Sequence, residues 1–411
     1  MISLQKLILG IGAVAFLASC GNSGKSSSKM TASTNASAAE QVYVPPGQHD
    51  EFYAFMSGGF SGQLTVYGLP SGRLFRRIPV FSQDAERGYG YDEETSPMLM
   101  TSEGFVPWDD SHHPELSQTD GVPDGKFIFI NGNNTPRIAK IDLTTFETTE
   151  IIEIPNSGGN HSSPFTTENS EYVVAGTRFS VPVPQRDMPI SEYKGNFKGN
   201  LTFISVEKET GDMELAFQIL VPGFDYDLAH SGKGKSHGWM FFSSYNTEEA
   251  YTKLEATASQ NDKDFIAAVN WKLAEQYMAE GKGHEMAASY LNNEMDHHTH
   301  SATSTKHDKV MVLHPDECPG LIYYLPTPKS PHGVDVDPTG EYIVGNGKLS
   351  SDMSVHSFTK MLAAIEAKDF EKTIEGIPVL TYESVLAGVV ERPGLGPLHT
   401  EFDGKGYAYT S

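Results

Sequence analysis

Short runs of apolar residues, separated by turn residues, recur along most of the chain after Val42. The first clear set is three successive runs at 126–131, 137–142 and 147–152, which predict antiparallel strands joined by tight turns. Similar runs follow at 172–175, 201–205, 214–219, 239–243, 265–270, 342–345 and 407–410. Repeated units of three or four short strands are typical of a β-propeller.

Three segments interrupt this pattern with helical spacing of apolar residues: 272–280, 285–293 and 357–370. We expect them to be helical insertions that decorate the sheets. The sequence therefore predicts an all-β fold, a β-propeller of the seven-bladed type, incomplete in this chain with about five to six blades. Because the last predicted strand runs to Ser411, we expect the chain to be a truncated part of a longer protein.

Five histidines lie at one phase of the repeated unit, each in a short turn-like frame beside a predicted strand. They are His112, His113, His161, His332 and His399. His113, His332 and His399 are followed by an aspartate-containing turn with glycine and then an aromatic or branched strand. If the units are blades arranged around an axis, this placement brings the imidazoles together at the hub.

Histidines in β-rich proteins are most often surface or turn residues, but recurrence at one phase weakens that interpretation. Imidazole suits copper, zinc, iron and nickel. No cysteine accompanies these histidines, which disfavours a thiolate-rich zinc site. His112 and His113 would point to opposite faces of a regular strand, so both can bind one cluster only if the backbone bends, which Pro114 makes plausible. The pattern leaves a polyhistidine metal site and ordinary turn histidines both open.

Composition agrees with a strand-rich exported protein. The 411 residues include 39 Gly and 24 Pro, and 30 Lys and Arg against 53 Asp and Glu give a net charge of −23. Such a surface repels duplex nucleic acid, since binding there depends on neutralising phosphates. It favours a basic protein partner instead.

The N-terminus predicts export and lipid attachment. Lys6 precedes an apolar run that is too short to span a membrane, and Leu17-Ala-Ser-Cys20 resembles a bacterial lipoprotein cleavage box. We expect residues 1–19 to be a signal peptide, 20–45 a disordered tether and 46–411 the partial propeller. The protein would then be periplasmic and tethered to the membrane through lipidated Cys20. Cys318 is expected to be a small residue in a turn.

The chain resembles the nitrous-oxide reductase family, in the lineage with Sec-type export, over roughly residues 52–411. The resemblance depends on Asp124-Gly-Lys-Phe-Ile-Phe-Ile-Asn131, Tyr245-Asn-Thr-Glu-Glu249, Pro331-His-Gly-Val334, Gly345-Asn-Gly-Lys-Leu-Ser350 and Gly396-Pro-Leu-His-Thr400, in the family's order. It implies two-electron reduction of N2O to N2 and water, a step of denitrification. It also implies a four-copper sulfide cluster with the five histidines above among its ligands. The family's second, dinuclear copper site belongs to a C-terminal cupredoxin domain that this sequence does not contain.

The resemblance further implies a homodimer when full length, a cytochrome c or cupredoxin as electron donor, and a calcium site. The expected calcium ligands are Tyr245 through its carbonyl, Glu248 and Asp264, with Asp262 as a rival to Asp264. Hard oxygen donors of this kind suit calcium. Asp109, Asp110 and Asp120 are candidate carboxylates for orienting the copper-binding imidazoles, although residues of this kind more commonly lie in solvated turns.

Two other functions remain open at this point. One alternative is a lipid-anchored propeller that serves as an interaction scaffold without metal. The other is a periplasmic copper or zinc buffer that uses a second group of histidines, His297, His298, His300 and His307. The sequence contains neither a Gly-x-Ser-x-Gly motif nor a His-Glu-x-x-His motif, so nothing in it favours a hydrolase.

Overall fold

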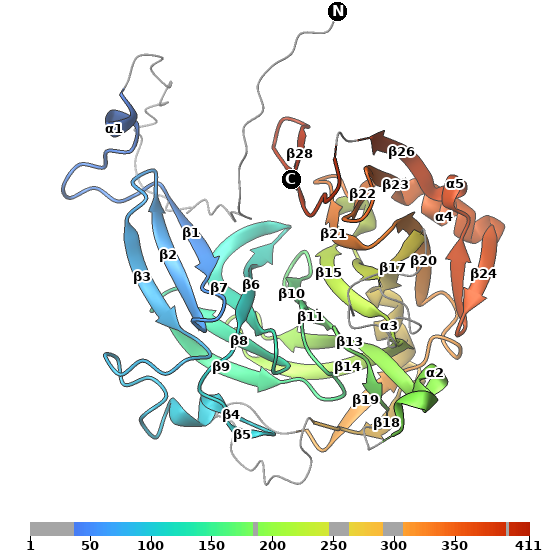
Figure 1. Ribbon diagram of the computed structural model, residues 1–411, viewed down its shortest axis with the longest axis horizontal. Coiled ribbons are helices and arrows are strands. Elements are labelled where there is room, and N and C mark those ends of the chain that lie inside the picture. Colours follow the sequence, from blue (N-terminus) through green and yellow to red (C-terminus); the bar gives the residue numbers. More distant parts are fainter. Residues whose placement is uncertain (1–36, 184–187, 246–262, 291–306, 392–393) are drawn as a thin grey trace, which may run out of the picture.

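The computed structural model describes residues 37–183, 188–245, 263–290, 307–391 and 394–411. Within them, small β-sheets follow one another in an open arc around a common axis (Figure 1). The predicted signal peptide and Cys20 lie outside the described residues. A single helical turn, α1 (Ala38–Gln41), capped by Ser37, occupies the end of the predicted tether. None of the helices in the described ranges has the length and apolarity required to cross a membrane.

Four of the sheets contain a four-stranded antiparallel blade. The first is β6 (Ser111–Thr119), β7 (Val122–Gly132), β8 (Arg137–Asp142) and β9 (Glu147–Glu153). The second is β10 (Ser162–Thr166), β11 (Tyr172–Gly176), β13 (Phe197–Val206) and β14 (Met213–Pro222). The third is β15 (Asp225–Ser231), β16 (Trp239–Tyr245), β17 (Lys263–Asn270) and β20 (Ile322–Pro328). The fourth is β21 (Pro331–Val336), β22 (Tyr342–Gly347), β23 (Asp352–Ser357) and β26 (Leu386–Glu391).

A smaller sheet lies at each end of this series. Before it comes the three-stranded sheet of β1 (Phe52–Ser57), β2 (Gln63–Leu69) and β3 (Leu74–Pro79), and after it the hairpin of β27 (Thr400–Phe402) and β28 (Ala408–Thr410). Short elements between the sheets are β4 (Met100–Thr101), β5 (Gly104–Phe105), β12 (Val181–Pro182), α2 (Tyr193–Asn196) and the 3-10 turns at 96–99, 190–192 and 234–236. The predicted all-β propeller architecture is confirmed, as four full blades and two partial sheets in the described part of the chain.

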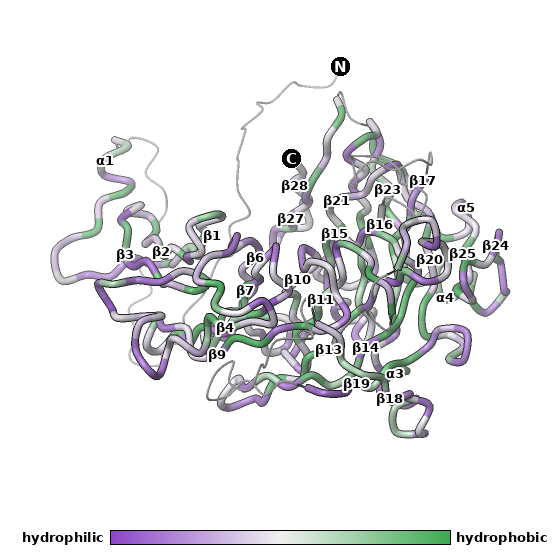
Figure 2. Tube along the Cα trace, turned by 60° about the horizontal axis from the view of Figure 1, so that its bottom comes forward, coloured by the Kyte–Doolittle hydropathy of each residue, from purple (hydrophilic) through white to green (hydrophobic). Residues whose placement is uncertain are grey.

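Apolar side chains fill the space between successive sheets. In β2 every second residue is buried, because successive side chains of a strand point to opposite faces of its sheet. The largest core cluster joins the second and third blades and includes Phe203, Phe242 and Tyr324, all fully buried. Each aromatic ring buried in this way contributes about 1.5–3 kcal/mol. Figure 2 shows hydrophobic stretches within the sheets and hydrophilic stretches mainly in protruding loops.

Two insertions each add strands to the outer edge of the preceding blade. Between β17 and β20, the chain forms α3 (Trp271–Ala279), β18 (His284–Ala287) and β19 (Lys309–Leu313), and β19 pairs in parallel with β14. Between β23 and β26 it forms α4 (Phe358–Ala367), β24 (Phe370–Ile374), β25 (Ile377–Leu380) and α5 (Tyr382–Val385), and β25 pairs in parallel with β20. Each insertion thus satisfies an outer strand that would otherwise expose unpaired backbone groups.

Two of the three predicted helices are confirmed, as α3 and α4. Their N-termini are capped by the side chains of Asn270 and Ser357. The predicted helix at 285–293 is wrong, because β18 pairs with β19 from His284↔Val312 to Ala287↔Lys309. Pairing along this sheet edge outweighs a weak helical spacing.

Candidate metal centre

The first strand of each blade lies nearest the axis, and neighbouring first strands contact one another in the order β6, β10, β15, β21 and β27 (Figure 1). Four of these inner strands have a break in register at the same level. The breaks lie between Ser111 and Pro114, Ser162 and Phe165, Tyr226 and Ala229, and Pro331 and Val334. Bulges of this kind turn side chains away from the regular alternation, and they recur beside functional sites.

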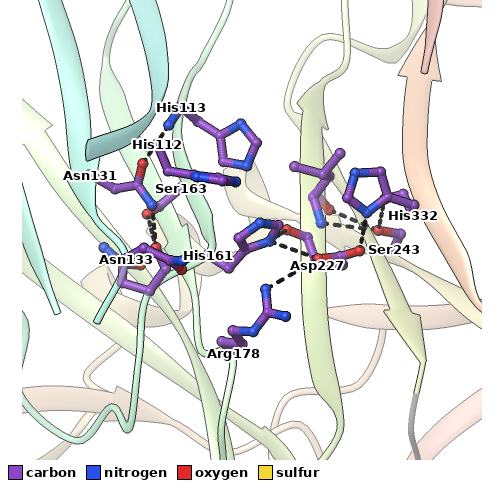
Figure 3. Close-up of polar contacts among 12 residues, drawn as sticks. His112, His113, Asn131, Asn133, His161, Ser163, Arg178, Asp227, Ser243 and His332 are labelled. Atoms are coloured by element: carbon purple, nitrogen blue, oxygen red, sulfur yellow. Dashed lines mark hydrogen bonds and ion pairs between the residues drawn. The ribbon is translucent and has the colours of Figure 1, made fainter. Parts of the chain in front are cut away.

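Three of the predicted ligands gather at these breaks. His112 and His113 lie within the break in β6, and His161 immediately precedes β10. Their ring centroids are 4.5–4.8 Å apart, and one ligating nitrogen from each ring lies within 4.8 Å of the others (Figure 3). This spacing suits imidazoles that share one ion or two adjacent ions, since metal–nitrogen bonds are about 2.0–2.1 Å long.

The other two predicted ligands continue the row along the hub. The ring of His332, within the break in β21, has its centroid 6.1 Å from that of His161. His399, immediately before β27, follows at 5.1 Å from His332. The structure therefore brings all five histidines to one place on the axis, from inner strands that are far apart in sequence.

Asp227, on the inner strand β15, lies between two of these histidines (Figure 3). Nδ1 of His161 is 2.7 Å from the Oδ1 of Asp227 and 3.1 Å from its backbone oxygen, and Nδ1 of His332 contacts Oδ2. The Asp227 side chain is 1% exposed. Burial alone would raise its pKa, but the hydrogen bonds from His161 and His332 hold the pKa well below the ordinary value. Because the carboxylate engages Nδ1 of both rings, their Nε2 atoms are left free to bind a metal.

Backbone contacts fix the positions of His113 and His332. The Asn131 side chain accepts a hydrogen bond from the His113 N–H at 2.7 Å and donates to the carbonyl of Asn160 at 2.5 Å. It thereby ties the break in β6 to the loop that holds His161. The hydroxyl of Ser243 donates to the carbonyl of His332 at 2.7 Å.

The electrostatics of the site favour neutral imidazoles, the form that binds metals. Burial lowers the pKa of His113 well below its ordinary value, and the nearby rings of His161 and His112 lower it further. Burial, and then the neighbouring His332, lower the pKa of His399 to about 4. The Nε2 atom of His113 is buried and has no hydrogen-bond partner. A metal ion would satisfy such a nitrogen, so the donor set fits copper or another ion that prefers imidazole.

Of the three carboxylates expected behind the copper ligands, only Asp110 lies beside one of the histidines, and Asp227 was not among those expected. Asp109 forms a buried ion pair with Arg137 at 3.1 Å. Asp110 has its Oδ2 3.7 Å from Nδ1 of His112, and it accepts a hydrogen bond from Asn133 at 3.0 Å. Asp120 is an exposed turn residue with φ of 52°. Asp227 has no histidine motif around it, and its signal is the inner-strand position that carries histidine in the other blades.

The predicted calcium ligands are only partly described. Asp264 on β17 is 1% exposed, and its Oδ2 accepts a hydrogen bond from the Ser330 N–H at 2.8 Å. Tyr245 ends β16, opposite Asp225 on β15. Glu248 and Asp262 lie outside the described residues, so the calcium site stays a prediction.

The second histidine group is also largely beyond the described ranges, which include only His307 of its four members. Burial lowers the pKa of His307. Cys318 is 1% exposed and belongs to the largest core cluster, which agrees with the structural role expected of it.

Comparison with known proteins places this site in a family context. The chain is 31% identical to the nitrous-oxide reductase of Pseudomonas fluorescens over 422 residues, which cover 99% of this chain and 59% of the relative. It is 30% identical to the nitrous-oxide reductase of Stutzerimonas stutzeri over 375 residues, which cover 90% of this chain and 53% of the relative. The chain thus spans between 53% and 59% of the length of these two curated relatives. No family model matches it.

Among solved structures, a chain of Kuenenia stuttgartiensis hydrazine synthase superposes with a TM-score of 0.49 at 12% identity. The superposition covers 87% of this chain and 76% of that one. These values are too low to bear on function.

Proposed function

This chain is a homologue of the nitrous-oxide reductases, and from this premise we propose that it forms the part of such an enzyme that binds the catalytic copper. His112, His113, His161, His332 and His399 would be ligands of a four-copper sulfide cluster. The substrate would be N2O, reduced by two electrons to N2 and water. The observation that supports this proposal most strongly is the convergence of five imidazoles from four inner strands and of one carboxylate, Asp227, on the propeller axis.

When bound, a multicopper cluster would supply two electrons to N2O, a weak ligand that a single mild metal centre activates poorly. The residues of the chain prepare the ligands for that task. Asp227 binds Nδ1 of His161 and His332, which fixes the orientation of both rings. Arg178, with Nη1 3.7 Å from Oδ1 of Asp227, balances part of the buried negative charge. Burial keeps the other imidazoles neutral and able to bind metal.

Further parts of the proposal come from the sequence and the family. The protein would be periplasmic, tethered to the membrane through lipidated Cys20, and would receive electrons from a cytochrome c or a cupredoxin. It would form a homodimer. Calcium would bind Tyr245, Glu248 and Asp264. The net charge of −23 supports steering of a basic donor, because complementary charge accelerates encounter at moderate salt.

Copper analysis of single variants tests the ligand assignment. We expect His332→Ala and His399→Ala to lose cluster copper and its visible absorption in the complete natural polypeptide, together with N2O turnover. His237→Ala is the matched control, since His237 pairs with Glu168 at 2.8 Å on another surface. Copper and turnover that survive both substitutions would refute the assignment. A metal-free protein that keeps a specific protein partner would favour the scaffold, and copper lost only with the 297–307 histidines would favour the metal buffer.

A further inference from the structure

A second pair of histidines lies in the β18–β19 hairpin, which the chain forms between β17 and β20 and which extends the outer edge of the second blade. His284 begins β18, and His314 immediately follows β19. The two ring centroids are 5.2 Å apart. Glu317 completes the group, with its Oε2 2.6 Å from Nε2 of His284. This group has no structural role in the axial site described above.

The fold, rather than chance rotamers, places these three side chains together. His284 is paired with Val312 in the β18–β19 hairpin, and His314 is two residues beyond Val312. Diagonal neighbours of this kind lie on one face of a hairpin, within reach of long side chains. His314 and Glu317 are then held by a turn in which the Glu317 N–H donates to the His314 carbonyl at 3.0 Å. Residues three apart in such a turn project side by side.

The chemistry of the group suits a divalent ion that prefers imidazole. A tetrahedral ion bound at about 2.1 Å by two imidazole nitrogens holds the ring centroids on the order of 5 Å apart. The hydrogen bond from His284 holds the pKa of Glu317 below its ordinary value, so its carboxylate is ionised at neutral pH. The side chains of His284 and Glu317 are 53% and 54% exposed, so they can turn toward a common ion at small cost.

A groove adjoins one of the three proposed ligands, His314. His314 and its neighbour Asp316 line a groove of about 440 Å³ between the outer edges of neighbouring blades. Water molecules in this groove can complete the coordination of an ion that the protein holds by three ligands. Asp316 adds negative charge beside the group.

We propose that His284, His314 and Glu317 form a peripheral site for a divalent transition-metal ion, Zn²⁺ or Cu²⁺, separate from the axial centre. Two imidazoles and one carboxylate bind both ions, and Cu²⁺ is expected to bind more tightly, following the general order of affinities for divalent metals. The site would allow the protein to hold such an ion whether or not the axial ligands carry copper.

Metal counting on the chelator-stripped full chain tests this proposal. After equilibrium dialysis against Zn²⁺ at neutral pH, the double variant H284A/H314A is expected to bind one zinc ion fewer than the unaltered chain. E285Q is the matched control, because Glu285 is the next residue along β18 and pairs with Lys309 instead. His284 is exposed and His314 is half-buried, and circular dichroism checks that the double variant keeps its fold.

A direct measurement locates the ion. Anomalous diffraction at the zinc edge should show a peak between His284 and His314. Equal zinc content in H284A/H314A and the unaltered chain, or a peak elsewhere, would overturn the proposal. So would loss of the same zinc ion on replacing His297, His298 and His300 alone. Because zinc content here is read without copper or N2O, failure of this site and failure of the proposed reductase function are distinguishable.

Discussion

Replacing Asp227 by asparagine perturbs the axial site without changing its volume. In the native protein each carboxylate oxygen of Asp227 faces an imidazole Nδ1. Oδ2 is hydrogen-bonded to His332, and Oδ1 lies 2.7 Å from Nδ1 of His161, whose hydrogen bond goes to the Asp227 backbone oxygen. The amide of asparagine offers one acceptor oxygen and one donor nitrogen. One of the two rings must therefore face an N–H group. It can do so only by moving its own proton from Nδ1 to Nε2, which blocks the nitrogen that would bind metal.

The expected loss can be worked out in two ways that agree. A buried hydrogen bond to a charged group contributes about 1.5–3 kcal/mol. Substitution of the groups that orient metal-binding histidines typically costs a factor of about 10–100 in metal affinity, which corresponds to about 1.4–2.7 kcal/mol. We therefore expect Asp227→Asn to weaken copper binding at the axis by about 10–100-fold.

A competition titration of copper against a chromophoric chelator measures this change. Asp225→Asn is the matched control, because Asp225 lies two residues away on β15, is also buried, and its carboxyl oxygens have no hydrogen-bond partner among the described residues. Thermal unfolding of both metal-free variants separates loss of affinity from loss of fold. If Asp227→Asn bound copper as tightly as the control, Asp227 would not act by orienting His161 and His332.

Three further predictions concern stability. Burial, and then the charge of Asp227, raise the pKa of Asp225 well above its ordinary value of 3.8. The free energy of unfolding should therefore fall as pH rises from 3.8 through the pKa of the folded state. Asp225→Asn should flatten this pH dependence and raise the unfolding temperature at neutral pH. Asn131→Ala leaves the His113 N–H without its acceptor and should cost about 1–3 kcal/mol in urea unfolding. Asn131→Asp keeps the acceptor but sets a buried carboxylate oxygen against the Asn160 carbonyl, so it should cost at least as much. Calcium chelation should lower the unfolding temperature of the native chain but not of Asp264→Ala, and equal responses would contradict the predicted calcium site.

The strands were predictable because their signal is local. The run at 137–142 became β8 with the same bounds, since alternate or continuous burial between blades demands an apolar pattern that the sequence displays. The insertions were harder. β18 and β19 form only because β14 presents an outer edge to them, and such pairing between distant segments leaves no periodicity in the residues that do the pairing.

The candidate site likewise has residues that the sequence could predict and one that it could not. Five histidines could be selected because one residue type recurs at one phase of a repeat. Asp227 occupies that phase in the remaining blade, yet it carries a different residue type because of its neighbours. His161 and His332 flank it on either side, and two Nδ1–H groups that face one another need an acceptor between them. The requirement exists only in three dimensions, so no inspection of the motif around Asp227 alone reveals it.

The breaks in register explain how consecutive residues can serve one centre. In a regular strand His112 and His113 would point to opposite faces of the sheet, and only one of them could face the axis. The break between Ser111 and Pro114 frees both residues from pairing with β7, and their rings then lie 4.5 Å apart. Asp227 and His332 lie within the corresponding breaks on β15 and β21, and His161 directly precedes the break on β10. Breaks on four inner strands therefore lie beside the inward-facing ligands, whereas outside the breaks the strands keep the pairing that holds the blades together.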